Sequence, residues 1–147
     1  MEAQATYDDV NLLLRLYELR REARLREARR WFAANFKARS LDEAVSLCPP
    51  GSEQDASLRM VLSYWEMAAS FITSGVLNAE LFFQSGGEML FVWERIRDIL
   101  PRMREARKNP FWMKNVETVA EAFIQWMKKR APEGYDAFSA MVRGEQR

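Results

Sequence analysis

The sequence predicts an all-α fold: a helical bundle of about four long helices with short connecting helices. The 147 residues are 48% hydrophobic and 12% aromatic, with 6 Gly and 5 Pro. That composition excludes a disordered chain and a turn-rich small β-domain. Apolar residues recur at helical spacing, and no strand-length alternation of β-branched residues occurs. We expect a single domain over residues 1–147, with a long first helix at about 7–36 and the bundle core at about 53–130.

The first helix is predicted by its start signal and by the absence of a stop signal. Thr6 and Asp9 resemble a capping box, and no Gly or Pro follows before Pro49. An unbroken helix from Tyr7 to Phe36 would be about 45 Å long. A globule of this size has a diameter of roughly 38 Å. The helix must therefore either break or lie against a partner.

Two apolar stripes run along this helix. The first contains Val10, Leu14, Tyr17, Leu25, Ala28, Phe32 and Phe36. The second contains Leu12, Leu16 and Leu19 and stops after Ala23. The first half of the helix consequently needs cover on two sides. We expect a homodimer in which Leu12, Leu16 and Leu19 face the partner, with Tyr17 also at the interface.

The middle of the chain predicts a central helix. Ser40 to Glu43 is a capping box for a short helix that ends before the turn at 49–51. The third helix, from about Glu53 to Ser74, has a polar stripe only about 80° wide. Because the rest of its surface is apolar, we expect it to lie in the middle of the bundle. Asn78 then caps a brief helix over 79–84.

The last third of the chain alternates amphipathic helices with breaks. A helix begins at Glu88, with Glu94 on its outer face, and Pro101 predicts a kink or a restart. Asn109-Pro110 resembles the start of the last long helix. A final helical turn or two follows Tyr135 and docks on the bundle.

Composition also restricts the classes of function. The chain has a formal charge of +1, no His and a single Cys. Disulfide scaffolds, Cys/His zinc sites and Ser-His or Cys-His catalytic pairs are therefore excluded. We expect no catalytic residue, metal ligand or cofactor. Whether the protein is an enzyme stays open, with the balance toward a non-enzymatic role.

An arginine-rich segment, Arg20 to Arg30, suggests nucleic-acid binding. Its arginines point all round the helix, and Glu22 and Glu27 stand at helical spacing to several of them. A solvated helix face explains the segment better, so nucleic acid is not an expected partner.

A small polar stripe on the third helix is the candidate ligand site. Glu66 is the charged residue at the helix centre, Ser63 and Ser70 flank it, and Trp65 adjoins it. A half-buried carboxylate among hydroxyls and aromatics could bind a cationic ligand. The alternative is structural: Glu66 pairs with an Arg of a neighbouring helix or reaches solvent.

The sequence also predicts a location. The first residues are acidic and polar, unlike a signal peptide. The most apolar stretch, 67–77, is far shorter than the roughly 20 residues that cross a bilayer. With an unpaired Cys48, these features favour a cytoplasmic protein without a membrane segment.

The middle of the chain resembles a known but uncharacterised family. An aromatic-Glu helix (63–69), a Gly-containing turn (75–82), a tryptophan-bearing helix (88–94) and a basic segment (102–108) follow in this order. The same order occurs in a group of short bacterial all-helical proteins described as domains of unknown function. The resemblance spans about residues 60–108, implies a helical fold and supplies no catalytic residue.

These observations leave three hypotheses of function. The leading one is a helical protein-interaction or scaffold module that acts as a homo-oligomer. The second is a small-molecule binder or enzyme with an aromatic pocket near Glu66. The third is weak nucleic-acid binding through the first helix.

Overall fold

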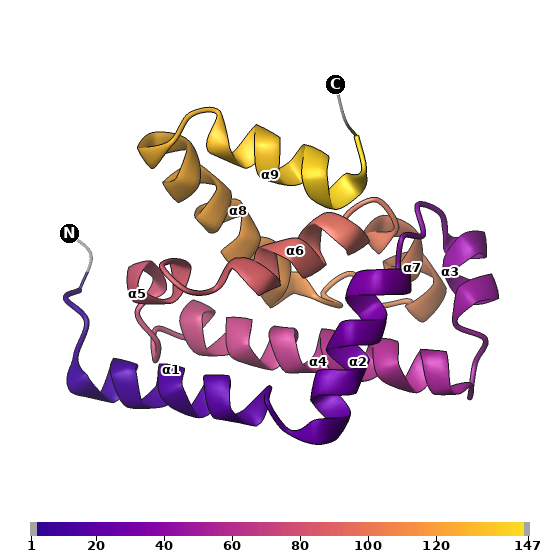
Figure 1. Cartoon of the computed structure of the whole chain (residues 1–147), viewed down its shortest axis with the longest axis horizontal. Helices are drawn as coiled ribbons and strands as arrows, with labels where there is room; N and C mark the ends of the chain where they lie inside the picture. Colours follow the sequence, from indigo (N-terminus) through magenta and orange to yellow (C-terminus); the bar gives the residue numbers. More distant parts are fainter. Residues whose placement is uncertain (1–2, 146–147) are drawn as a thin grey trace.

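The computed structural model describes residues 3–145, and all regular secondary structure in that range is helical. The predicted all-α bundle is confirmed. The helices, drawn in Figure 1, are α1 (Tyr7–Leu19), α2 (Ala23–Asn35), α3 (Leu41–Leu47), α4 (Glu53–Thr73), α5 (Ala79–Phe83), α6 (Gly87–Ile96), α7 (Leu100–Arg107), α8 (Lys114–Arg130) and α9 (Gly134–Arg143).

Helix α4 lies at the centre of the bundle, as its broad apolar surface predicts. It packs against both α2 and α8, while α6 packs against α8 and α9. The side chains that α4 buries are Leu58, Val61, Leu62, Tyr64, Trp65, Ala68 and Ala69. They join one hydrophobic core with residues from almost every other helix.

The expected first helix at 7–36 is broken, which is one of the two alternatives that its length left open. Helix α1 ends at Leu19 and α2 begins at Ala23. The Glu22 side chain caps α2 by accepting hydrogen bonds from the backbone N–H groups of Arg24 (3.0 Å) and Leu25 (3.1 Å). A glutamate in this role leaves no Gly or Pro signal in the sequence.

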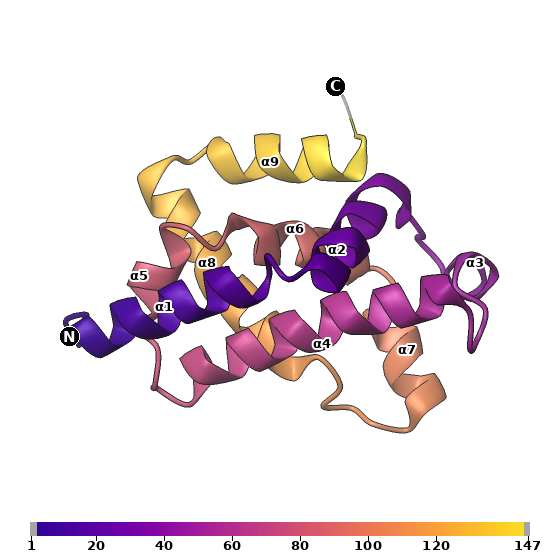
Figure 2. The ribbon, with the colours of Figure 1, turned by 60° about the horizontal axis from the view of Figure 1, so that its bottom comes forward.

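Contacts with other helices stabilise this break. The Tyr64 hydroxyl of α4 donates to the Leu16 carbonyl, and Arg29 Nη1 donates to the Arg20 carbonyl at 2.7 Å. The break leaves the Arg20 carbonyl without a helical partner, and Arg29 satisfies it. The Leu16 carbonyl already accepts from the Arg20 backbone N–H at 3.2 Å, and Tyr64 adds a second hydrogen bond to it. The chain then turns, and α2 crosses α4 instead of overhanging the globule (Figures 1 and 2).

Two later boundaries give one confirmation and one correction. Pro101 lies in the first turn of α7, so the predicted restart is confirmed. Helix α8 begins at Lys114 and not after Asn109-Pro110. Asn109 Oδ1 instead accepts from the backbone N–H of Phe111 at 3.0 Å, and Met113 has a left-handed backbone with φ 59°.

Candidate functional site

A groove lies where α3, α4, α7 and the α7–α8 loop meet, at the end of α4 remote from α5 (Figures 1 and 2). Its cavity has a volume of about 660 Å³. Most of its wall is apolar, with Leu58 and Leu62 from α4, Met103 from α7, and Trp112 and Met113 from the loop. We call it the α3–α4–α7 groove.

This groove is open to solvent. Cys48 and Ala44 line it as buried residues, whereas Val45 is 50% exposed and Phe111 is 73% exposed. Single exposed apolar side chains are ordinary, but apolar side chains that line one groove together are typical of an interaction surface. The groove therefore has an apolar floor and an apolar rim.

The charged side chains of the groove differ in their partners. Asp55 accepts from the Gly51 backbone N–H at 3.2 Å and lies 3.5 Å from Arg59 Nε. The Arg107 guanidinium lies over the Trp112 ring, 4.4 Å from its centroid. Within the described part of the chain, no carboxylate oxygen approaches Arg107 within 4.0 Å.

Glu66 lines the groove, yet its carboxylate serves the start of α8. Glu66 Oε1 accepts from the Val116 backbone N–H at 2.9 Å. Glu66 Oε2 accepts from the backbone N–H (3.3 Å) and from Nδ2 (3.1 Å) of Asn115. Helix α8 has no capping side chain of its own, since it follows Met113. Glu66 therefore caps α8 across the bundle. The sequence suggested instead that Glu66 binds a cationic ligand, pairs with an Arg of a neighbouring helix or reaches solvent.

Two of the four predicted ligand residues line the groove and two do not. Ser63 and Glu66 line the groove, whereas Trp65 and Ser70 do not. Trp65 is 1% exposed and faces α2, where it adjoins Phe32. Adjacent residues on a helix point about 100° apart, and here Trp65 points toward α2 while Glu66 points toward the start of α8. The aromatic side chains of the groove come from the α7–α8 loop instead.

The predicted interface residues of α1 differ in their exposure to solvent. Leu16 is buried within the chain, so it is not available to a partner, and Leu12 is partly buried. Tyr17 and Leu19 are exposed. The stripe that faces out is instead the one with Val10 and Leu14. The expectation that the leucine stripe faces a partner is therefore wrong for Leu16.

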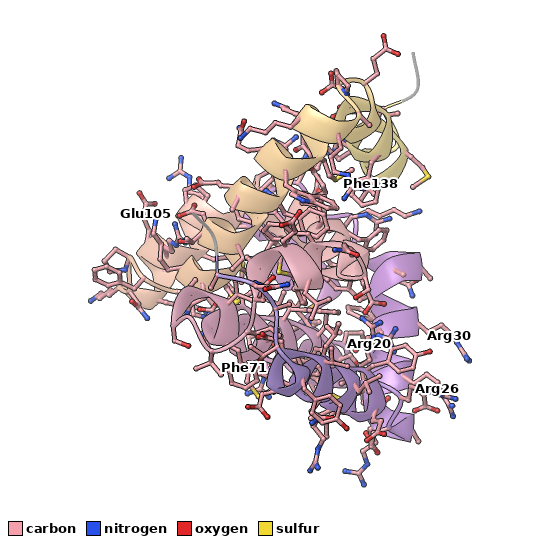
Figure 3. The ribbon with its side chains drawn as sticks, turned by 90° about the vertical axis from the view of Figure 1, so that its left-hand side faces the viewer. Arg20, Arg26, Arg30, Phe71, Glu105 and Phe138 are labelled. Carbon is pink, nitrogen blue, oxygen red and sulfur yellow. The ribbon has the colours of Figure 1, made fainter. Side chains whose placement is uncertain are left out.

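The arginine-rich segment does not form one continuous basic face. Figure 3 shows Arg26 and Arg30 pointing away from the body of the molecule, with Arg20 lying against it. Arg20 is over the rings of Tyr17 (5.0 Å) and Trp65 (5.6 Å). Arg29 from the same segment forms hydrogen bonds with Glu88 through Nε and Nη2. These contacts engage Arg20 and Arg29 within the fold, whereas Arg24, Arg26 and Arg30 are exposed.

A buried carboxylate links α6 to α9, a position that helical spacing did not predict. Glu94 was expected on the outer face but is 2% exposed. It accepts hydrogen bonds from the hydroxyls of Tyr135 and Ser139 (3.2 Å) and lies 2.8 Å from Arg97 Nε. Burial, together with this carboxylate, raises the pKa of Tyr135 to about 12. The i, i+4 spacing of Tyr135 and Ser139 on an otherwise apolar face was the available signal.

Two kinds of feature are absent from the part of the chain that the structure describes. In residues 3–145, no group of three or more Cys, Asp or Glu side chains is placed to hold a metal ion. Across the same range, each helix is too short or too polar to cross a bilayer.

These features define a small all-helical protein with an open apolar groove. The chain belongs to the family described as domain of unknown function DUF4760, whose model matches residues 5–143. This match confirms the resemblance to an uncharacterised domain family. Neither a curated protein nor a solved structure matches the chain.

Proposed function

We propose that the protein is a non-enzymatic interaction module whose α3–α4–α7 groove binds the apolar face of an amphipathic helix from a protein partner. The observation that carries the proposal is the open apolar rim, where Val45 and Phe111 are half or more exposed beside a buried floor. An amphipathic helix in a groove covers floor and rim together through side chains at i, i+3, i+4 and i+7.

A small-molecule site is the second candidate, and the openness of the groove disfavours it. Sites for small ligands typically enclose 70–90% of the ligand surface. A compact ligand on the groove floor would leave Phe111 and Val45 still in contact with water. The volume of about 660 Å³ lies within the range of ligand pockets, so the experiment below includes a small amphiphile.

The charges of the groove specify the partner further. Asp55 and Glu66 are both engaged in hydrogen bonds within the fold. The Arg107 guanidinium lies over the Trp112 ring and forms no ion pair with a carboxylate of the described residues. An acidic residue beside the apolar face of the partner helix would complement Arg107.

Peptide display tests this proposal. A library of random peptides of about 16 residues is selected on the immobilised protein, and affinities are measured by fluorescence polarisation. We expect enriched sequences with apolar residues at helical spacing and a neighbouring Asp or Glu. Val45→Glu and Phe111→Glu should each weaken binding at least tenfold. Val76→Glu is the matched control, because Val76 is 64% exposed and lies outside the groove.

Two results would overturn the proposal. Enriched peptides that bind Val45→Glu and Phe111→Glu as tightly as the wild type would place the interaction elsewhere. Stoichiometric binding of dodecanoate in calorimetry, with no peptide enriched, would favour the small-molecule site.

A further inference from the structure

A second, smaller cavity lies where the C-terminal end of α9 meets α6 and the segment that follows α2 (Figure 2). Its volume is about 130 Å³, and it shares no lining residue with the α3–α4–α7 groove. We call it the α6–α9 cavity. Most of the side chains around it are charged: the cations Lys37, Arg39, Arg95 and Arg143 and the carboxylates Glu94 and Asp98.

Both carboxylates of the α6–α9 cavity already have partners within the fold. Glu94 accepts from two hydroxyls of α9 and lies 2.8 Å from Arg97 Nε, and Arg97 does not line the cavity. Asp98 Oδ2 accepts from Arg143 Nη2 at 2.5 Å. Among the described residues, the other three cations of the cavity form no ion pair with either carboxylate.

Arg95 has a charge that no carboxylate of the described residues neutralises. Its guanidinium donates to backbone carbonyls instead: Nε to Val142 at 2.9 Å, and Nη1 to Phe36 at 2.8 Å and to Ala33 at 3.2 Å. Burial lowers the pKa of Arg95, because taking the guanidinium out of water disfavours its charged form. An anion in the cavity would supply the missing counter-charge.

A carboxylate of the chain itself is held by two of the other cations. Glu145 Oε1 accepts from Arg143 Nε at 3.2 Å and from Arg39 Nη1 at 3.1 Å. The hydrogen bond from Arg143, followed by the charges of Arg143 and Arg39, lowers the pKa of Glu145. Glu145 does not line the cavity, so it leaves the space between the cations open to a second anion. Lys37 is exposed and forms no ion pair within the described part of the chain.

We propose that the α6–α9 cavity binds a phosphate group, with Arg95, Arg39 and Lys37 as the cations that hold it. A volume of about 130 Å³ suits one small oxyanion and lies well below the roughly 300–1,000 Å³ of sites for drug-sized ligands. A phosphate monoester has a charge of about −1.5 to −2 at pH 7, which matches the two cations, Arg95 and Lys37, that lack a carboxylate. Its several acceptor oxygens suit donors that approach from different elements.

An NMR titration tests the site. Amide correlation spectra are recorded with potassium phosphate at pH 7 and, for comparison, with potassium chloride of equal ionic strength. We expect the backbone amides of residues 37–39 and 142–144 to shift with phosphate, with half-saturation at or below about 1 mM. Acetate should bind at least about tenfold more weakly, because it has one charge and fewer acceptors. Glycerol 3-phosphate distinguishes the source of the phosphate: tighter binding than inorganic phosphate indicates a monoester, and weaker binding indicates the free ion.

Substitutions identify the cations. Lys37→Gln should raise the dissociation constant for phosphate about threefold, and Arg95→Gln at least about tenfold. Lys129→Gln is the matched control, because Lys129 is an exposed lysine of α8 outside the cavity. Circular dichroism verifies the fold of Arg95→Gln, since Arg95 also binds three carbonyls. Lys37→Gln keeps the proposal testable if Arg95→Gln does not fold.

A variant that should gain affinity separates an anion site from a purely structural network. Glu145→Gln removes the carboxylate that Arg39 and Arg143 hold, so it should tighten phosphate binding about threefold. No tightening would contradict the role of Arg39. Amides that phosphate shifts no more than chloride does at about 20 mM would refute the site. A dissociation constant that Lys37→Gln and Arg95→Gln both leave unchanged would place the anion elsewhere, and acetate that binds as tightly as phosphate would refute the class of ligand.

Discussion

Replacing Glu66 by alanine should destabilise the protein through the start of α8. The Glu66 carboxylate accepts three hydrogen bonds, two from the backbone N–H groups of Asn115 and Val116 and one from the Asn115 side chain. Losing a helix cap typically costs about 1 kcal/mol, and hydrogen bonds to a charged group contribute about 1.5–3 kcal/mol. Because Glu66 is half-buried and water can replace part of this bonding, we expect Glu66→Ala to lower the free energy of unfolding by about 2 kcal/mol.

The expected shift in melting temperature follows from the chain length. At this size, 1 kcal/mol corresponds to about 3 °C, so Glu66→Ala should melt about 6 °C lower. Glu66→Gln keeps an acceptor oxygen but loses the attraction to the helix dipole, so it should melt about 3 °C lower. Thermal unfolding followed by circular dichroism measures both shifts. Glu121→Ala provides the matched control, because Glu121 is an exposed glutamate of α8.

Hydrogen exchange locates the effect of this substitution. The backbone amides of Asn115 and Val116 should exchange faster in Glu66→Ala, while amides near the centre of α4 keep their protection. A Glu66→Ala variant that melts within about 1 °C of the wild type would show that the cap contributes nothing. The reasoning that assigns Glu66 to the fold would then be refuted.

Three further predictions follow from buried polar groups. Burial raises the pKa of Tyr64 and of Tyr135 to about 12 from 10.0, so the stability that depends on their protonated hydroxyls is complete below pH 10 and declines as the pH rises toward 12; urea unfolding of Tyr135→Phe should show a smaller decline than the wild type. Glu94→Ala should cost about 3 kcal/mol in urea unfolding, because it leaves the buried partners of the carboxylate unpaired, and a cost below 1 kcal/mol would contradict this. Burial, and then the nearby Asp55 charge, raise the pKa of the Cys48 thiol, so iodoacetamide at pH 8 should alkylate it at least tenfold more slowly than a small thiol, with a normal rate restored in urea.

Local signals predicted most helix starts correctly. Thr6 with Asp9 forms the expected capping box, and the side chains of Ser40 and Asn78 accept from the backbone of their own helices. Each of these contacts joins residues three positions apart, so a short stretch of sequence contains both partners. The proline restart at 101 has the same local origin.

Boundaries set by distant residues could not be predicted from the sequence. The break after α1 depends on Tyr64 and Arg29, which supply donors to carbonyls at its end. The start of α8 depends on Glu66, 49 residues away from Asn115. Helix propensity in the segment around Arg20 is high, and these tertiary contacts outweigh it.

The candidate site was predicted in part for the same reason. Helical spacing placed Ser63 and Glu66 on one polar stripe, and the groove contains both. The spacing carries no information about which loop approaches that stripe, so Trp112 and Phe111 were missed. On α1, spacing identified two apolar stripes but gave no criterion for which one faces the core. The hydrogen bond from Tyr64 to the Leu16 carbonyl lies on the buried side and shows the direction that the fold selects.

Contacts with other helices fix α1 at both ends. Its first turn is joined to the start of α5, because Asp9 Oδ1 accepts from the Asn78 backbone N–H at 2.8 Å. Its last turn is joined to α4 through Tyr64. A helix held at both ends presents its exposed face in one conformation, which lowers the entropy lost on binding. The groove elements α3 and α7 lie at the opposite end of the molecule (Figures 1 and 2). A partner helix bound in the groove would therefore not contact the exposed face of α1.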